Sequence, residues 1–132
     1  MKTYGDLRDL INRRADKGEM ISVNETDSLL VAYNRMRASD VSQIPVMNNN
    51  KLMGILDEED LLFAVSKDQS SFSENVSDYM MDHLDTLQFD ASKDELLSIL
   101  TEGKVAIIYD GETFIGFVTK VDLINYYRNR FK

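Results

Sequence analysis

The chain has 132 residues, of which 43% are hydrophobic, so it is long enough for one ordinary domain or for two small ones that share a core. Its formal net charge of −8 disfavours nucleic acids and anionic membranes as partners, because binding to either depends on a basic surface. The absence of cysteine excludes disulfides, a thiolate nucleophile and a cysteine-based zinc site. With neither a long apolar run nor the apolar core of a signal peptide, the sequence predicts a cytoplasmic protein.

The first segment, Tyr4 to Ala15, is expected to be a helix, because Leu7, Leu10 and Ile11 recur at helical spacing. Several arginines make this lead helix locally basic. Its polar side is either an ordinary solvated face or a surface that contacts a partner or a catalytic domain.

The next elements are a strand, a helix, a hairpin and a closing helix. We place them at Met20–Val23, Ser28–Met36, Gln43–Met47 with Lys51–Leu56, and Asp57–Val65. Thr26 or Asp27 would cap the first of these helices. Pro45 is the only proline, and it should lie at a sheet edge or beside a pocket, where no backbone donor is needed.

A polar, serine-rich stretch over 67–75 is typical of a linker, and it separates two halves, 1–66 and 76–132. The second half repeats the order of the first. Ser92–Glu95 is a capping box at the start of a helix, and Asp110-Gly111 is a strong turn signal between the strands Lys104–Tyr109 and Thr113–Val118. A final helix is expected after Thr119.

The strongest signal is an internal repeat in which a strand turns directly into a helix. At a constant offset of 62, Gly54, Asp57, Asp60 and Leu61 correspond to Gly116, Thr119, Asp122 and Leu123. A unit of about sixty residues is barely large enough to be stable alone. We therefore expect the two units to pack against each other.

These phrases resemble the cystathionine-β-synthase (CBS) domain, which occurs as tandem pairs. The resemblance is carried by Ser42–Val46, by Val76–Met80 and by the Gly-x-x-Thr/Asp-x-x-Asp ending of both halves, and it covers about Gly5 to Arg128. It implies an α/β (α+β) fold of two β-α-β-β-α repeats with pseudo-two-fold symmetry. It also implies a homodimer, because such pairs commonly associate through their helices.

The first half is most similar to the C-terminal regulatory region of bacterial cystathionine β-synthases, through Asp6–Leu7, Asn12–Arg14 and Asp40–Val46. For such an enzyme, the resemblance implies a pyridoxal-phosphate-dependent catalytic domain upstream. The present residues include no cysteine, a single histidine (His83), no metal-ligand cluster and no glycine-rich phosphate loop. We therefore expect the chain itself not to be an enzyme and to require no cofactor.

Thr119 and Asp122 are the main candidate site residues. Their spacing alone is explained by a capping box, in which the two side chains bind backbone amides at a helix start. The resemblance implies a second role in a cleft between the repeats, where the Asp accepts hydrogen bonds from ribose hydroxyls and the Thr hydroxyl contacts ribose or phosphate. A carboxylate suits a vicinal diol because it only accepts, and a helix start suits phosphate.

The resemblance places the remaining ligand contacts mainly in the first half. The residues that would hold the adenine or the tail of the ligand, or line its apolar side, are Ile21, Val23, Val41, Ser42, Gln43, Ile44, Pro45 and Phe117. On pattern alone, the apolar members of this set fit an ordinary core strand equally well.

The equivalent position in the first half, Asp57 and Asp60, departs from the pattern. Glu58 and Glu59 lie between them, which gives four consecutive carboxylates. At about 4 Å and an effective dielectric of about 20, one carboxylate repels one phosphate charge by roughly 4 kcal/mol. We expect this second, degenerate site to be empty or to take an uncharged or cationic ligand; a Mg²⁺ ion and a plain, well-capped helix start are the alternatives.

Two functions fit the sequence. The first is a regulatory module for a small adenosyl ligand, which the resemblance implies to be S-adenosylmethionine, AMP, ADP or ATP. The acidic character favours S-adenosylmethionine, because that molecule carries a sulfonium and no phosphate. The second is a ligand-free structural or oligomerisation module, in which Thr119 and Asp122 only cap a helix.

Overall fold

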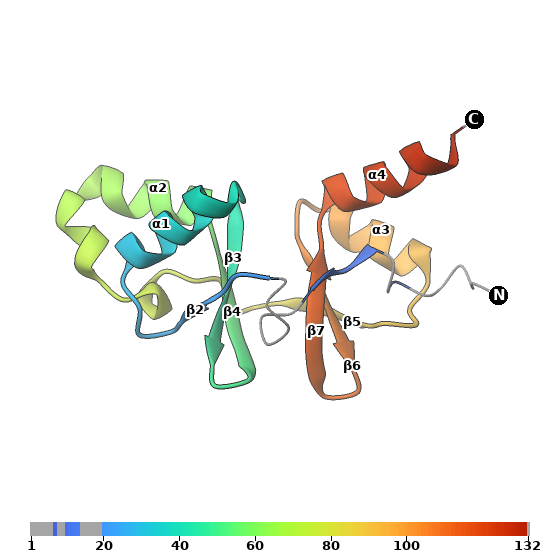
Figure 1. Ribbon diagram of the computed structural model, residues 1–132, viewed down its shortest axis with the longest axis horizontal. Coiled ribbons are helices and arrows are strands. Elements are labelled where there is room, and N and C mark those ends of the chain that lie inside the picture. Colours follow the sequence, from blue (N-terminus) through green and yellow to red (C-terminus); the bar gives the residue numbers. More distant parts are fainter. Residues whose placement is uncertain (1–6, 8–9, 14–19, 132) are drawn as a thin grey trace. The chain divides into compact units, whose positions relative to one another are not determined.

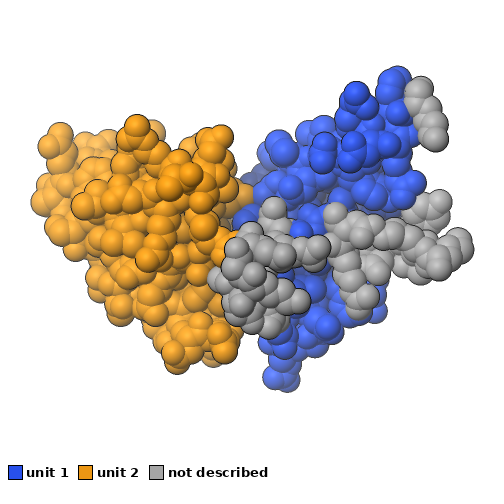
Figure 2. All heavy atoms as spheres, viewed as in Figure 1, with its two compact units in different colours: residues 1–19, 85–132 blue, residues 20–84 orange. Residues whose placement is uncertain are grey.

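The computed structural model describes residues 7, 10–13 and 20–131 and divides the chain into two compact units (Figures 1 and 2). Unit 1 comprises residues 1–19 and 85–132, and unit 2 comprises residues 20–84. Each unit has its own sheet and its own apolar core. The expected α/β architecture of two β-α-β-β-α repeats is confirmed.

Unit 2 is built on a three-stranded sheet of order β2-β3-β4. β2 (Val23–Asn24) runs parallel to β3 (Gln43–Asn48), which pairs antiparallel with β4 (Lys51–Asp57). Figure 1 shows α1 (Leu29–Ser39) and α2 (Glu58–Lys67) on the same side of this sheet. The buried residues that join helices and sheet are Val23, Leu29, Ala32, Met36, Ile44, Val46, Leu56, Leu61, Ala64 and Val76.

Unit 1 has a four-stranded sheet of order β1-β7-β6-β5 and two helices. In chain order its elements are β1 (Asn12–Arg13), β5 (Asp85–Gln88), α3 (Lys93–Thr101), β6 (Ala106–Asp110), β7 (Thr113–Val118) and α4 (Lys120–Arg130). β5 is parallel to β6, and the other pairs are antiparallel. The core of the unit consists of Leu7, Leu10, Leu96, Leu100, Ala106, Ile108, Val118 and Leu123.

The lead helix expected over Tyr4–Ala15 is wrong where the structure describes it. Leu7 and Leu10 are buried in the core of unit 1, and the Leu10 amide donates to the Leu7 carbonyl (3.0 Å) in a turn. Asn12–Arg13 forms β1 along the edge of β7. An edge strand leaves backbone donors and acceptors to be satisfied, and pairing with them outweighs a local helical preference. Residues 4–6, 8–9 and 14–15 lie outside the described residues.

The stretch over 67–75, expected as a linker, packs within unit 2. A 3-10 helix covers Gln69–Ser73, and the Leu29 amide donates to the Glu74 carbonyl (2.9 Å). The ring of Phe72 packs edge-on against Tyr33, with centroids 6.1 Å apart. The division of the sequence into halves 1–66 and 76–132 stays a prediction. The two compact units are divided differently, because residues 1–19 belong to the same unit as residues 85–132, and residues 76–84 belong to the unit of residues 20–75.

The repeated glycines lie where a neighbouring segment crosses the hairpin of each unit. In unit 2, Ile55 and Met81 exchange two backbone hydrogen bonds of 2.9 and 2.8 Å. A Cβ on Gly54 would lie 2.6 Å from the carbonyl oxygen of Met81, which leaves room only for glycine. In unit 1, Gly116 pairs with β1 at a φ of 154°, a conformation that favours glycine.

Pro45 lies in the central strand of its sheet, so of the two expected positions, a sheet edge or the side of a pocket, the edge is wrong. It is paired with Ile55, whose backbone N–H and C=O bind Met81 instead. The Pro45–Ile55 pair therefore exchanges no ladder hydrogen bonds, and on the other side β2 begins only opposite Val46. Pro45 thus occupies a position that needs no backbone donor, which is the physical requirement behind the prediction.

The start of α1 differs by one or two residues from the expected cap. Ser28 is the N-cap, and its hydroxyl accepts a hydrogen bond from the Val31 amide (3.2 Å). Asp27 accepts from the amide of Asn24 instead (2.8 Å), and Thr26 donates to the Asn24 side chain. A tight turn before the helix therefore uses both of the predicted capping residues.

Candidate functional site

The junction of β7 and α4 holds Thr119 and Asp122 in a complete capping box. The Asp122 amide donates to the Thr119 hydroxyl (3.3 Å), while Oδ2 of Asp122 accepts from the Thr119 amide (2.9 Å) and hydroxyl (3.0 Å). Thr119 is extended, so the chain leaves a buried strand and enters the helix without a loop. Both side chains are half-buried. The capping expectation is confirmed, and the carboxylate lies at the positive end of the helix dipole.

The equivalent junction of β4 and α2 has the same geometry but a different charge. The Asp60 amide donates to Oδ1 of Asp57 (2.8 Å), and the Asp57 amide lies 3.5 Å from Oδ2 of Asp60. Burial, reinforced by the negative charge of Asp57, raises the pKa of Asp60 from its ordinary 3.8 to about 6. This helix start already resists holding its own two charges, so it is poorly suited to an additional anion.

The other predicted ligand contacts divide between the two units. Phe117, Thr119 and Asp122 belong to unit 1, whereas Ile21, Val23, Val41, Ser42, Gln43, Ile44 and Pro45 belong to unit 2. Within unit 2, Ser42 and Gln43 lie beside the degenerate site: the Ser42 carbonyl accepts from the Glu58 amide (2.9 Å), and Gln43 is opposite Asp57 in the ladder.

Most of the apolar candidates are structural. Val23, Ile44 and Phe117 are at most 7% exposed, and Pro45 is buried with them in the sheets. Ile21 is half-buried and packs against the core of unit 2. The polar candidates Ser42, Gln43, Thr119 and Asp122, in contrast, are all at least partly exposed.

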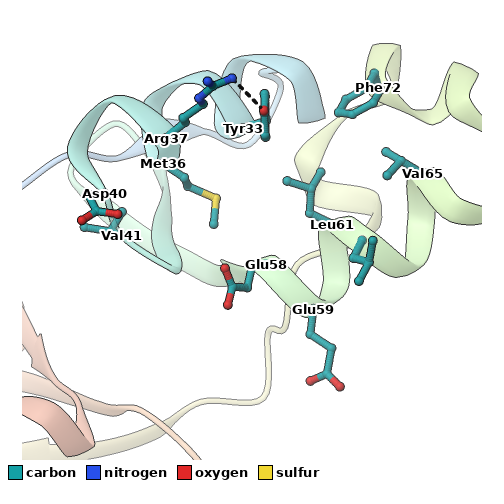
Figure 3. Close-up of a pocket in the computed structure, with 11 residues that line it drawn as sticks. Tyr33, Met36, Arg37, Asp40, Val41, Glu58, Glu59, Leu61, Val65 and Phe72 are labelled. Atoms are coloured by element: carbon teal, nitrogen blue, oxygen red, sulfur yellow. Dashed lines mark hydrogen bonds between the residues drawn. The ribbon is translucent and has the colours of Figure 1, made fainter.

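A feature that sequence reasoning missed is a groove of about 660 Å³ between α1 and α2 in unit 2. Figure 3 shows Met36 and Leu61 directed into it, Tyr33 and Phe72 at one end, and Val41 at the other. Val41, predicted as a ligand contact, therefore lines this groove. The sequence signal for this groove was Leu62, an apolar residue outside the core-facing side of its helix. In the structure the Leu62 side chain is 66% exposed.

The described residues form neither a metal-binding cluster nor a helix that could cross a membrane. No group of three or more histidine, aspartate or glutamate side chains in ranges 7, 10–13 and 20–131 is arranged to hold a metal ion. None of the helices in those ranges combines the length and the apolar character that a bilayer crossing requires.

Comparisons with known proteins address the family directly. A family model, the CBS domain, matches residues 7–67 and 76–129. No curated protein sequence gives a significant match.

Solved structures share the fold at low sequence identity. An uncharacterized conserved protein from Pyrococcus horikoshii has a TM-score of 0.81 and 20% identity, with 100% of this chain and 98% of that one covered. A CBS domain-containing protein of unknown function from Bacillus anthracis has a TM-score of 0.79 and 18% identity, with coverages of 96% and 94%. OpuCA of Staphylococcus aureus has a TM-score of 0.69 and 24% identity, with coverages of 85% and 95%.

None of these three neighbours is named as a cystathionine β-synthase, so the closer similarity of the first half to that enzyme is not shown. The family match, in contrast, covers both halves of the chain and includes both capping boxes. The chain belongs to the CBS-domain family, as a tandem CBS pair.

Proposed function

We propose that this CBS pair is a regulatory module that binds a small adenosyl ligand at the start of α4. CBS pairs typically bind adenosyl ligands, and both repeats are present here. In the proposed complex, Asp122 accepts hydrogen bonds from ribose hydroxyls and the Thr119 hydroxyl contacts ribose or phosphate. A carboxylate has about four acceptor positions, so helix capping and ligand binding by Asp122 are compatible.

The observation that carries this proposal is the difference between the two equivalent helix starts. At α4, one carboxylate faces a neutral hydroxyl across the capping box. At α2, two carboxylates face each other, and the pKa of Asp60 is raised to about 6. A ribose diol at α4 therefore meets a carboxylate that can accept from both of its hydroxyls, whereas at α2 burial and the charge of Asp57 oppose ionisation of the corresponding Asp60 and weaken it as an acceptor.

The preferred ligand follows from the charge of the protein. S-adenosylmethionine has no phosphate and carries a sulfonium, which suits a chain of net charge −8 better than AMP or ATP does. Binding would favour one conformation of the module, and a partner domain would respond to that shift. We further propose a homodimer, which rests on the resemblance to tandem CBS pairs. We also propose a pyridoxal-phosphate-dependent cystathionine β-synthase as the regulated enzyme, which rests on the sequence phrases of the first half.

The alternative function is a ligand-free structural or oligomerisation module. It is favoured by the completeness of both capping boxes, in which each side chain already binds the backbone amide that the helix start offers. A side chain that is retained only as a cap needs no ligand to explain it.

Isothermal titration calorimetry with S-adenosylmethionine, AMP and ATP separates the two functions. We expect one ligand to give heat with the wild type, no heat with Asp122→Ala, and unchanged heat with the matched control Asp60→Ala. Asp122→Asn retains an acceptor for the cap, so a loss of binding in this variant assigns the effect to the charge and not to a frayed helix. No heat with any ligand at several temperatures would establish the structural module instead.

A further inference from the structure

The segment before unit 2 opens the first half of the sequence but folds as part of unit 1. Its described residues are 7 and 10–13, and we call them the strap. Leu7 and Leu10 are at most 9% exposed and lie in the core of unit 1, and the Leu7 amide donates to the Phe89 carbonyl (2.8 Å). Beside them, β1 pairs with the edge of β7 (Figure 1). The strap is therefore attached to unit 1 both by its side chains and by its backbone.

The backbone attachment lies directly before the candidate site. Asn12 is opposite Phe117 in the ladder, and Arg13 is opposite Gly116. Thr119 follows Phe117 by two residues, at the point where β7 passes into α4. Without the strap, the backbone groups on this edge of β7 lose their partners, and a strand end with fewer hydrogen bonds opens more readily.

The side-chain attachment reaches the first turn of α4. Leu7 and Leu10 belong to the same apolar core as Val118 and Leu123, which lie on either side of the capping box in the sequence. Leu123 is 4% exposed, and its amide donates to the Thr119 carbonyl (3.3 Å). Because protein cores are close-packed, withdrawing two leucines leaves a cavity into which their neighbours relax. Undocking of the strap therefore loosens the turn of α4 that follows Thr119.

We propose that the strap and the start of α4 form one switching unit: docking of the strap orders the capping box, and a ligand at the capping box fastens the strap. The ordering follows from the shared sheet edge and core, whereas its use as the output of the site rests on the proposed function. Coupling of this kind is reciprocal, so the factor by which a ligand favours docking equals the factor by which docking raises the ligand affinity. The chain passes from unit 1 into unit 2 at Met20, so the strap is continuous with the start of the other unit.

Amide hydrogen exchange of the whole chain, resolved by NMR, tests the ordering. Leu7→Ala removes part of the packing of the strap. Leu100→Ala is the matched control, because it removes the same atoms from the same core at a side chain of α3 that is 2% exposed. The two reporter amides occupy equivalent helical positions: that of Leu123 donates to the N-cap carbonyl of α4 (3.3 Å), and that of Leu96 to the N-cap carbonyl of α3 (3.2 Å). In Leu7→Ala, we expect exchange at Leu123 to accelerate at least about fivefold more than exchange at Leu96. In Leu100→Ala, exchange at Leu96 should accelerate at least as much as exchange at Leu123.

The output role is tested with S-adenosylmethionine and AMP as the probes. For the ligand that gives heat with the wild type, saturation should slow exchange of the Leu10 amide at least about fivefold. Leu7→Ala should weaken the calorimetric affinity for that ligand by a similar factor. Circular dichroism checks that each variant is folded. If Leu7→Ala unfolds the chain, Leu10→Val replaces it, since it removes only one methylene from the strap.

Equal acceleration of exchange at Leu123 and Leu96 in Leu7→Ala overturns the proposal. An unchanged ligand affinity in a variant whose amide at position 10 exchanges rapidly also overturns it, and in that case the adenosyl site itself stands. A wild type that gives no heat with either probe overturns the proposed function and the output role together. The comparison of Leu123 with Leu96 then still decides whether the strap orders the start of α4.

Discussion

Replacing Asp60 with asparagine should stabilise the protein at neutral pH, although it removes a charge from a helix start. Asparagine retains an oxygen that can accept from the Asp57 amide, but it cannot ionise beside the Asp57 carboxylate. In the wild type, burial and then the charge of Asp57 oppose ionisation of Asp60 and raise its pKa to about 6. The substitution therefore mimics the protonated side chain that the fold prefers.

The size of the effect follows from the two pKa values. A tenfold change in proton affinity is worth about 1.4 kcal/mol, so the difference between 3.8 and about 6 sets an upper limit of about 3 kcal/mol. Asp60 is partly exposed and solvent screens its charge, so we expect about 1–2 kcal/mol at neutral pH. Because the pKa of Asp60 is raised in the folded state, the stability that its protonated side chain contributes is fully present below pH 3.8. This stability is lost as the pH rises through about 6.

Urea denaturation of wild type and Asp60→Asn at about pH 7.5 and about pH 4 measures this directly. The variant should be more stable at the higher pH, and most of its advantage should disappear at the lower one. Asp122→Asn is the matched control: its capping partner is the neutral Thr119, so it should bring no gain at neutral pH. An advantage of Asp60→Asn that is equal at both pH values, or absent at both, would refute the electrostatic reasoning.

Three further substitutions test the packing. Leu100→Ala opens a cavity in the core of unit 1, where the Leu100 side chain is 2% exposed, and should lower the free energy of unfolding in urea by about 2–5 kcal/mol. The control Leu97→Ala lies on the same helix, but its side chain is 44% exposed, so it should lower the free energy of unfolding far less. Gly54→Ala forces a Cβ toward the carbonyl oxygen of Met81 and should lower stability by about 1–3 kcal/mol; an unchanged melting temperature would show that the segment yields freely. Ser28→Ala removes the N-cap of α1 and should cost about 1 kcal/mol, whereas a larger loss with Thr26→Ala would restore the cap that the sequence predicted.

The elements that sequence reasoning located are those whose signals are local. Asp110-Gly111 predicted a hairpin, and β6 and β7 meet at this turn with Gly111 at a φ of 64°. The capping boxes at Asp57 and Thr119 predicted the starts of α2 and α4, because the residues that satisfy the first amides lie within the same turn.

The elements that sequence reasoning missed depend on partners that are far away in the sequence. The lead segment forms β1 because it pairs with β7, which lies about a hundred residues later, and the Leu7 amide binds the Phe89 carbonyl (2.8 Å). Leucines at helical spacing cannot reveal that partner. Phe72 is an apolar residue within a polar stretch, which suggests that it docks on the fold, but the sequence does not identify Tyr33 as its partner.

The two capping boxes of the candidate site were predictable from the sequence, whereas their energetics were less so. The four carboxylates over 57–60 predicted repulsion of a phosphate, but the reluctance of Asp60 itself to ionise depends first on burial, which only the fold supplies. The α1–α2 groove is assembled from two helices and the following 3-10 turn, so no single stretch of sequence announces it.

The central claim is that an adenosyl ligand binds at the start of α4 and not at the start of α2. An amide-resolved NMR titration with S-adenosylmethionine and then with AMP tests it most directly. We predict saturable shifts of the backbone amides over Thr119–Asp122, while those over Asp57–Asp60 remain in place. Saturable shifts confined to Asp57–Asp60, or no shift at Thr119–Asp122 with either ligand, would contradict the claim.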